Sequence, residues 1–225
     1  MEEFVVKATV VSIFRDSASY LERYFTQLNN QLNSEPIALS LVEGDSIDPT
    51  YKFLLKRTQG REYTKVTKLD LHKPRYGSVV HPERFEILAD TFNAGLDAID
   101  WDTEWVVYLD SDLIISNLTI QRLIDRADDN AIAPYIFAGK AFYDIRGFRK
   151  NGEHFAPFPP YVKGAKTATK FEVDSAGAML VIPGRYIKAG ARLAKEDCVV
   201  GLCRNLRAMG CRIYADPTIK INHPC

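Results

Sequence analysis

The sequence carries no excess charge and no long apolar run. Its 225 residues include 29 basic and 29 acidic side chains, so the formal net charge is zero. A neutral chain has no long-range attraction to a nucleic-acid backbone or an anionic membrane, although a local basic cleft is compatible with a neutral total. No apolar stretch approaches the roughly 20 residues that cross a bilayer. We therefore expect neither a nucleic-acid partner nor a transmembrane segment.

Cysteine spacings typical of zinc sites are also missing. The four cysteines are confined to the C-terminal end of the chain, at Cys198, Cys203, Cys211 and Cys225. None forms a Cys-x-x-Cys pair and no histidine falls at zinc-finger spacing, which argues against a structural zinc site. We expect buried free thiols in a reducing compartment. The acidic start, Met1-Glu2-Glu3, lacks the pattern of a signal peptide, so a soluble, cytoplasmic protein or a domain of a longer one is expected.

What is present is the composition of a globular enzyme-sized domain. Hydrophobic residues make up 46% and charged residues 26%, which excludes disordered, collagen-like and coiled-coil chains. A chain of this length buries a full core without disulfides. We predict a single domain over 1–225, with a first half at 1–115 and a second half at 116–225.

The first half alternates between apolar strands and amphipathic helices. Strands are predicted at 4–13, 37–42, 66–71 and 105–109. The first helix is predicted to follow Ser17 or Ser19, with Glu22 completing a capping box. A second begins at Asp48-Pro49, and a third carries an apolar stripe from 85 to 99. This order predicts a doubly wound α/β fold with a mainly parallel sheet, in which ligands bind beyond the carboxyl ends of the strands.

The second half has a different rhythm. Strands are predicted at 132–137, 142–148 and 171–182, with a long loop of aromatic, Pro and Gly residues at 150–170. A last helix over 199–209 ends at Gly210, before a short strand at 212–214. We predict a mixed-strand region that does not repeat the first half. The loop at 150–170 is interpreted as an acceptor-binding loop or lid, or as a mobile surface loop.

Asp110-Ser111-Asp112 follows the fourth apolar strand and is the strongest chemical signal. Two carboxylates this close repel each other unless a positive charge lies between them. Mg²⁺ and Mn²⁺ bind one or two carboxylates and complete their shell with substrate phosphates. A strand-end turn or a helix cap uses the same residue types, so both interpretations stay open at this point.

Several segments resemble those of nucleotide-sugar glycosyltransferases with the GT-A fold. The segment 105–114 (WVVYLDSDLI) resembles their Asp-x-Asp motif. Phe14-Arg15-Asp16 is similar to the base-binding turn after the first strand, and 41–48 to the acidic turn that holds the nucleoside. The segment 84–96 is similar to the helix that precedes the Asp-x-Asp strand.

The resemblance continues into the second half. The segment 174–180 (DSAGAML) resembles the acceptor-side pattern Asp-x-x-Gly-Gly, and is nearest to fungal mannosyltransferases and capsule-associated glycosyltransferases. Ala178 replaces the second glycine, which puts the close backbone approach of that pattern in question. Lys195-Glu196-Asp197 is similar to the Glu-Asp motif of inverting enzymes, and His223 stands where a C-terminal histidine often completes the metal site.

The resemblance implies a metal-dependent glycosyltransferase that moves a sugar from a UDP- or GDP-linked donor to a glycan or other hydroxyl acceptor. It implies Mn²⁺ or Mg²⁺ bound by Asp110, Asp112 and His223. Donor contacts are implied for Phe14, Arg15, Glu43, Asp45, Arg84, Asp110, Ser111 and Gly177. Asp197 is implied as the general base, with Glu196 as its substitute.

Ordinary structural roles are open to the same residues. Glu43 and Asp45 suit turn hydrogen bonds, and Arg84 suits a salt bridge on its helix. Asp197 suits a charge at a helix N-terminus, and His223 suits a surface position near a frayed end.

Other functions have weaker support. A sugar nucleotidyltransferase or a dinucleotide enzyme needs a Gly-rich loop after the first strand, and 12–17 has no glycine. A glycosyltransferase-like module without turnover is the remaining alternative. Stereochemistry is open as well, because the Glu-Asp motif favours inversion and the mannosyltransferase resemblance favours retention. Nothing in the sequence indicates the oligomeric state.

Overall fold

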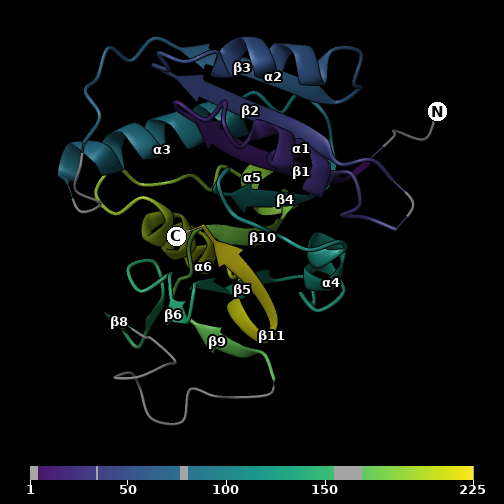
Figure 1. The fold of residues 1–225 in the computed structure, drawn as a ribbon. Helices are drawn as coiled ribbons and strands as arrows, with labels where there is room; N and C mark the ends of the chain where they lie inside the picture. The colour runs from purple at the N-terminus through teal and green to yellow at the C-terminus, as the bar shows by residue number, and fades with distance from the viewer. Residues whose placement is uncertain (1–4, 34, 77–80, 155–168, 225) are drawn as a thin grey trace.

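The computed structural model describes residues 5–33, 35–76, 81–154 and 169–224 as a mixed α/β structure (Figure 1). The strands are β1 (Val6–Phe14), β2 (Ala38–Gly44), β3 (Thr64–Leu69), β4 (Thr103–Leu109), β5 (Ala131–Ala138), β6 (Ala141–Phe142), β7 (Arg149–Lys150), β8 (Glu153–His154), β9 (Phe171–Val173), β10 (Met179–Pro183) and β11 (Ile213–His223). The helices are α1 (Leu21–Leu28), α2 (Thr50–Thr58), α3 (Pro82–Asp97), α4 (Thr119–Ile124), α5 (Gly184–Lys188) and α6 (Val199–Ala208).

One sheet runs through the whole described chain. It has nine strands among the described residues, in the order β3-β2-β1-β4-β10-β5-β11-β9, with β6 beside β5, while β7 and β8 pair separately. The strands β3, β2, β1 and β4 are parallel, β10 is antiparallel to both β4 and β5, and β11 is parallel to β5. The carboxyl ends of β1, β2, β4, β5 and β11 therefore meet the amino end of β10 at one edge of the sheet.

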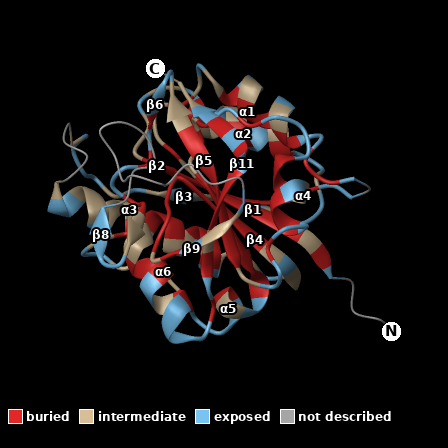
Figure 2. Cartoon of the chain, turned by 90° about the horizontal axis from the view of Figure 1, so that it is seen from below, coloured by how far each residue is buried: buried red, intermediate tan, exposed pale blue. Residues whose placement is uncertain are grey.

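Helices cover both faces of the sheet and create two cores. On one face α1, α2 and α4 contribute Phe25, Leu54 and Leu123 to the first core. On the other face α3 and α6 contribute Phe92 and Leu202 to the second. Figure 2 shows the strands as a buried layer between helices whose outer surfaces are exposed. This is the α/β class with a mostly parallel central sheet that the sequence predicts.

Two predicted strands of the second half are wrong. The apolar run at 171–182 is not one strand but two, β9 at the sheet edge and β10 in its centre, because the chain turns between them where Ala178 has a left-handed φ of 52°. The predicted strand at 142–148 is limited to β6. Beyond it the chain turns, and Phe148 is buried by packing edge-on against Phe142 with ring centroids 5.3 Å apart.

Two terminal features also differ from the prediction. The strand predicted at 212–214 extends as β11 to His223, because a register shift between Asp216 and Lys220 lets pairing with β5 resume. The predicted capping box is not formed: α1 begins at Leu21, its N-cap residue makes no side-chain capping bond, and the Ser17 hydroxyl donates to the carbonyl of Arg15 instead. Among the described residues, no helix combines the length and apolarity needed to cross a membrane.

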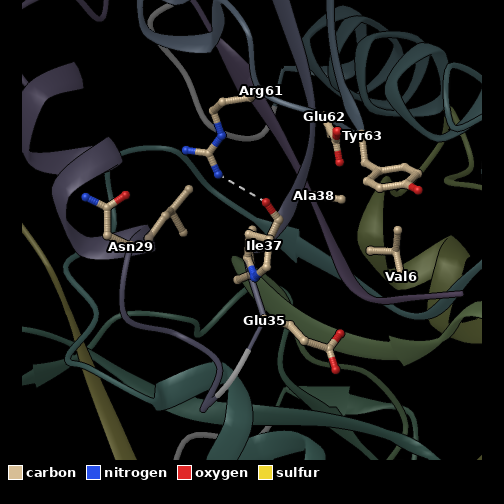
Figure 3. Close-up of a pocket in the computed structure, with 10 residues that line it drawn as sticks. Val6, Asn29, Glu35, Ile37, Ala38, Arg61, Glu62 and Tyr63 are labelled. Atoms are coloured by element: carbon tan, nitrogen blue, oxygen red, sulfur yellow. Dashed lines mark hydrogen bonds between the residues drawn. The ribbon is translucent and has the colours of Figure 1, made fainter. Parts of the chain in front are cut away.

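A surface cavity of about 470 Å³ lies at the opposite edge of the sheet (Figure 3). Val6 and Ala38, at the amino ends of β1 and β2, line it together with Tyr63 before β3. Arg61 donates to the Ile37 carbonyl at 3.1 Å across its wall. The cavity is therefore separated by the length of the strands from the edge that carries the aspartates.

Candidate active site

Asp110, Ser111 and Asp112 leave β4 at the edge where the carboxyl ends of the strands meet. The N–H of Asp110 donates to the carbonyl of Ala178 at 2.8 Å, so the amino end of β10 fixes the end of β4. The hydroxyl of Ser111 is buried and lies 3.1 Å from that of Tyr20. Ser111 thus faces the protein interior through its side chain, and the two aspartates flank it.

Polar side chains on and after α1 hold the segment that follows Asp112. They lie one helical turn apart and are Arg23, Gln27 and Gln31. Arg23 donates to the carbonyl of Asp112 at 2.8 Å. Gln27 donates to the carbonyl of Leu113 at 2.9 Å and accepts from the N–H of Ile115 at 3.2 Å. Buried backbone groups need such partners, so α1 determines the path of the chain behind the aspartates.

Three carboxylates share the site. Burial, followed by the charges of Asp112 and Asp144, raises the pKa of Asp110 to about 8, and the guanidinium of Arg84 opposes this rise. Arg84 lies in the first turn of α3, and its predicted contact with the donor stays a prediction. Like charges held together in a low dielectric favour protonation unless a cation joins them. Burial and mutual repulsion thus favour the protonated form of Asp110 in the absence of a cation.

Asp144 organises the turn before β10. Burial raises its pKa to about 7, while the N–H groups of Gly177 and Gly147 lower it. The Gly177 N–H donates to Oδ2 at 2.7 Å. A Cβ on Gly177 would lie 3.1 Å from Asp144 Oδ1 and 3.0 Å from Val199, so there is little room for a side chain at this position. The contact of Gly177 with Asp144 is made by its backbone N–H. Ala178 adopts the left-handed conformation that the expected glycine would take without strain.

His223 ends β11 beside Asp112. Its Nε2 lies 3.2 Å from Asp112 Oδ2, and its side chain is 19% exposed. The backbone pairs with Ala138 of β5, so the position near the end of the chain is not frayed. The structure therefore brings the predicted imidazole and the predicted carboxylate together from residues more than a hundred positions apart in the sequence.

The donor set fits a divalent cation that also binds substrate oxygens. No group of three or more His, Cys, Asp or Glu side chains within the described ranges is close enough to hold an ion by itself. Mg²⁺ and Mn²⁺ bound to nucleotides commonly use one or two carboxylates and take the remaining ligands from phosphates and water. Asp112 and His223, whose Oδ2 and Nε2 lie 3.2 Å apart, could supply one carboxylate and one imidazole of such a ligand set.

Glu43 lies at the same edge of the sheet, near the end of β2. It is the penultimate residue of β2 and is buried, and its Oε1 accepts from the N–H of Ser46 at 2.7 Å. Its Oε2 is buried and has no hydrogen-bond partner among the described residues. A buried carboxylate oxygen without a partner is costly, so Glu43 is arranged to accept one further hydrogen bond.

The other predicted donor residues have partners within the protein. Asp45 accepts from the N–H groups of 71–73 at 2.9, 3.1 and 2.9 Å, and these bonds lower its pKa although burial opposes them. Arg15 donates to the carbonyl of Lys73 at 2.8 Å. Phe14 is buried and packs edge-on against Tyr24 with centroids 5.0 Å apart. Their donor contacts stay predictions, with the structural roles now visible beside them.

Asp197 and Glu196 lie in the turn that leads into α6. Glu196 is exposed, whereas Asp197 is partly covered and accepts from Arg204 at 2.6 Å. Cys198 lies within electrostatic reach of both this turn and the aspartates. Burial raises the pKa of its thiol to about 12, and the charges of Asp110 and Asp197 add to that rise. Asp197 thus borders the site, and its catalytic role stays a prediction.

Sequence reasoning missed Tyr143 and Asp144. They follow β6 without any periodic pattern, and the partners that give them importance, His223 and Gly177, are distant in the sequence. The only local signal in the sequence is an aspartate, Asp144, three residues before a glycine, Gly147. The predicted acceptor loop at 150–170 lies mostly outside the described residues, as do 77–80 and Cys225.

The chain is similar to known proteins in sequence family and in fold. The family model of glycosyl transferase family 2 matches residues 9–188. The crystal structure of S. aureus TarS 1-349 is similar, with 14% identity, a TM-score of 0.60 and coverage of 97% of this chain and 60% of that one. Its complex with UDP-GlcNAc matches with 15% identity and a TM-score of 0.61, over 98% and 59% of the two chains.

These matches determine the family and the fold. This chain spans about three fifths of the TarS chain, and a search of curated protein sequences finds no significant match. The predicted GT-A fold is confirmed by the family model and the shared fold. The chain belongs to glycosyl transferase family 2.

Proposed function

We propose that the protein transfers a sugar from a nucleoside-diphosphate sugar to a hydroxyl acceptor, with Mn²⁺ or Mg²⁺ bound at Asp112 and His223. The observation that carries this proposal is the convergence of Asp110, Asp112 and His223 at the edge where the strands end. In open α/β sheets ligands bind at that edge. A divalent cation there would neutralise charge on the departing nucleoside diphosphate.

The donor is proposed to extend from Glu43 to the aspartates. Glu43 Oε2 would accept a hydrogen bond from the base or ribose, since it is buried without a partner. Arg84, within electrostatic reach of Asp110, would bind the diphosphate. The TarS complexes contain UDP and UDP-GlcNAc, which favours a uridine donor. The resemblance to fungal mannosyltransferases keeps a GDP-linked donor as the alternative.

Asp197 is proposed to accept the proton of the acceptor hydroxyl. The acceptor oxygen then forms a bond to the anomeric carbon while the bond from that carbon to the diphosphate breaks. Arg204 donates to Asp197 at 2.6 Å and so restricts where the proposed base can lie. This role belongs to an inverting reaction, and in a retaining reaction Asp197 would serve to orient the acceptor.

The first experiment is a thermal-shift screen of UDP, GDP, UDP-GlcNAc and GDP-mannose, each with Mn²⁺, Mg²⁺ or a chelator. A ligand that binds only the folded state raises Tm by mass action, about 2.7 kcal/mol of stabilisation at a hundredfold excess over Kd. We expect stabilisation by one base and only with metal. Release of free nucleoside diphosphate is then measured with sugar and glycan acceptors.

The variant Asp112→Asn tests the metal site. It should keep the Tm of the ligand-free protein and lose the metal-dependent shift and the transfer activity. Asp102→Asn is the matched control, because Asp102 is an aspartate with a side chain 30% exposed at the opposite end of β4. If the protein binds a nucleotide but releases no nucleoside diphosphate in the presence of any acceptor, a binding module without turnover would be supported instead. No shift with any nucleotide would contradict the proposal.

A further inference from the structure

Tyr143 lies flat against His223. The two ring centroids are 3.9 Å apart and the ring planes differ by 15°. Tyr143 follows β6 and its N–H donates to the carbonyl of Ile136 at 2.9 Å, so its backbone is attached to β5. His223 pairs with the same strand at Ala138. The stacked pair is therefore built on one strand that both backbones share.

The backbone of His223 is also attached to the segment behind the aspartates. Asn222 and Ile114 exchange two hydrogen bonds, at 2.7 and 3.1 Å. These contacts fix the Cα of His223 but leave the two side-chain torsions free. The ring of Tyr143 covers one face of the imidazole and removes the orientations that would enter its space. In the orientation that remains, Nε2 lies 3.2 Å from Asp112 Oδ2.

We propose that Tyr143 is a positioning residue whose ring holds the imidazole of His223 toward Asp112 and so presets the pair for a divalent cation. The proposal rests on the proposed function, since that function assigns the metal to this pair. A ligand that is already oriented loses less side-chain freedom when the ion binds. Residues that orient metal ligands typically contribute about 10–100-fold to metal affinity.

Two variants separate the contributions of the tyrosine side chain. Tyr143→Phe keeps the flat ring and removes the hydroxyl, whereas Tyr143→Leu keeps apolar bulk and removes the flat ring. Mn²⁺ affinity is measured by electron paramagnetic resonance of the free ion, with Mn²⁺ alone and with UDP or GDP added. The phenylalanine variant should bind as the wild type does, and the leucine variant about 10-fold more weakly. Tyr63→Leu is the control, because Tyr63 is 36% exposed against 37% for Tyr143 and lies at the opposite edge.

A second readout needs no metal. An imidazole under an aromatic ring has its ring protons shifted upfield, and the sequence has four histidines, so His223→Gln assigns the signal. In chelated protein the signal should move downfield in Tyr143→Leu and stay in Tyr143→Phe. Equal Mn²⁺ binding by wild type and Tyr143→Leu, or an unmoved signal, would overturn this inference and leave the proposed function standing. Absence of Mn²⁺ binding by the wild type in every mixture would overturn both.

Discussion

At the scale of single residues, Asp144 links the charge of the site to protein stability. The residue is 8% exposed, and the pKa of its carboxyl rises from 3.8 to about 7 on folding. Both states are protonated well below pH 4, but between about pH 4 and about pH 7 the unfolded chain releases a proton that the folded protein keeps. Folding stability therefore falls as pH rises through this window, by on the order of 2–4 kcal/mol for this group.

Asp144→Asn removes this titration, so its free energy of unfolding should fall less than that of the wild type between about pH 4.5 and about pH 8. Urea unfolding at both pH values measures the two slopes. Asp110 changes in the same direction, so part of the wild-type slope remains. Asp102→Asn, paired with Lys188 at the other edge, should keep the full slope. Parallel slopes for wild type and Asp144→Asn would mean that Asp144 is ionised in the folded protein.

Asp197 and Glu196 offer a matched test of the base. Asp197→Asn should bind the donor with near-normal affinity and lower transfer by about 100-fold or more, because a positioned base typically contributes that much. Glu196→Gln, on the exposed neighbour, should transfer at nearly the wild-type rate. Donor binding by thermal shift and release of nucleoside diphosphate separate the two steps. If Asp197→Asn transfers sugar at the wild-type rate, Asp197 is not the base, and its ion pair with Arg204 is its only role.

The residue types of the site could be predicted from the sequence, but their partners could not. Glu43 and Asp45 share one turn and the same chemistry, so nothing local distinguishes them. The two carboxylates differ in their partners. The N–H groups of 71–73 donate to Asp45, whereas Oε2 of Glu43 is buried and has no hydrogen-bond partner among the described residues. His223 was predicted through a resemblance, while Tyr143, which lies on it, has no pattern that marks it.

At the scale of elements, Arg23 and Gln27 on α1, and Gln31 after it, hold the backbone that follows Asp112. Gln27→Met fills a similar volume but cannot pair the carbonyl of Leu113 or the N–H of Ile115, both in buried residues. We expect a loss of about 1–3 kcal/mol in the free energy of unfolding, measured with urea. Gln121→Met on α4 removes a bond to Asp125 at the surface and should cost less than about 0.5 kcal/mol. Equal costs would mean that water replaces Gln27 without penalty.

Elements with clear periodicity were predicted well, and those decided by distant contacts were not. The strands β1, β2, β4 and β5 are mainly apolar and mostly buried, so their runs of apolar residues identify them in the sequence. The run at 171–182 looks like one strand because its polar turn is short, and only the different neighbours of β9 and β10 separate it. The last strand passes Pro217 because of a register shift with β5, which a sequence pattern does not encode.

At the scale of the whole molecule, the two predicted halves share one sheet. Five residue pairs join β4 to β10, from Leu109 opposite Met179 to Trp105 opposite Pro183. Val181 is fully buried there and pairs with Val107 on one side and Ile132 on the other. An interface this central cannot open without exposing both cores, so we expect the halves to unfold together.

The two tryptophans, Trp101 and Trp105, lie in the first half, so fluorescence reports on that half while far-UV circular dichroism reports on all helices and strands. Urea transitions by the two probes should coincide. Val181→Ala should lower both midpoints equally, with a cost of about 1–3 kcal/mol for the lost methyl groups and the space they leave. A fluorescence midpoint that separates from the dichroism midpoint, in either protein, would mean that 1–115 and 116–225 are independent domains. The convergence of Glu43, Asp112 and His223 would then depend on docking between domains rather than on one continuous sheet.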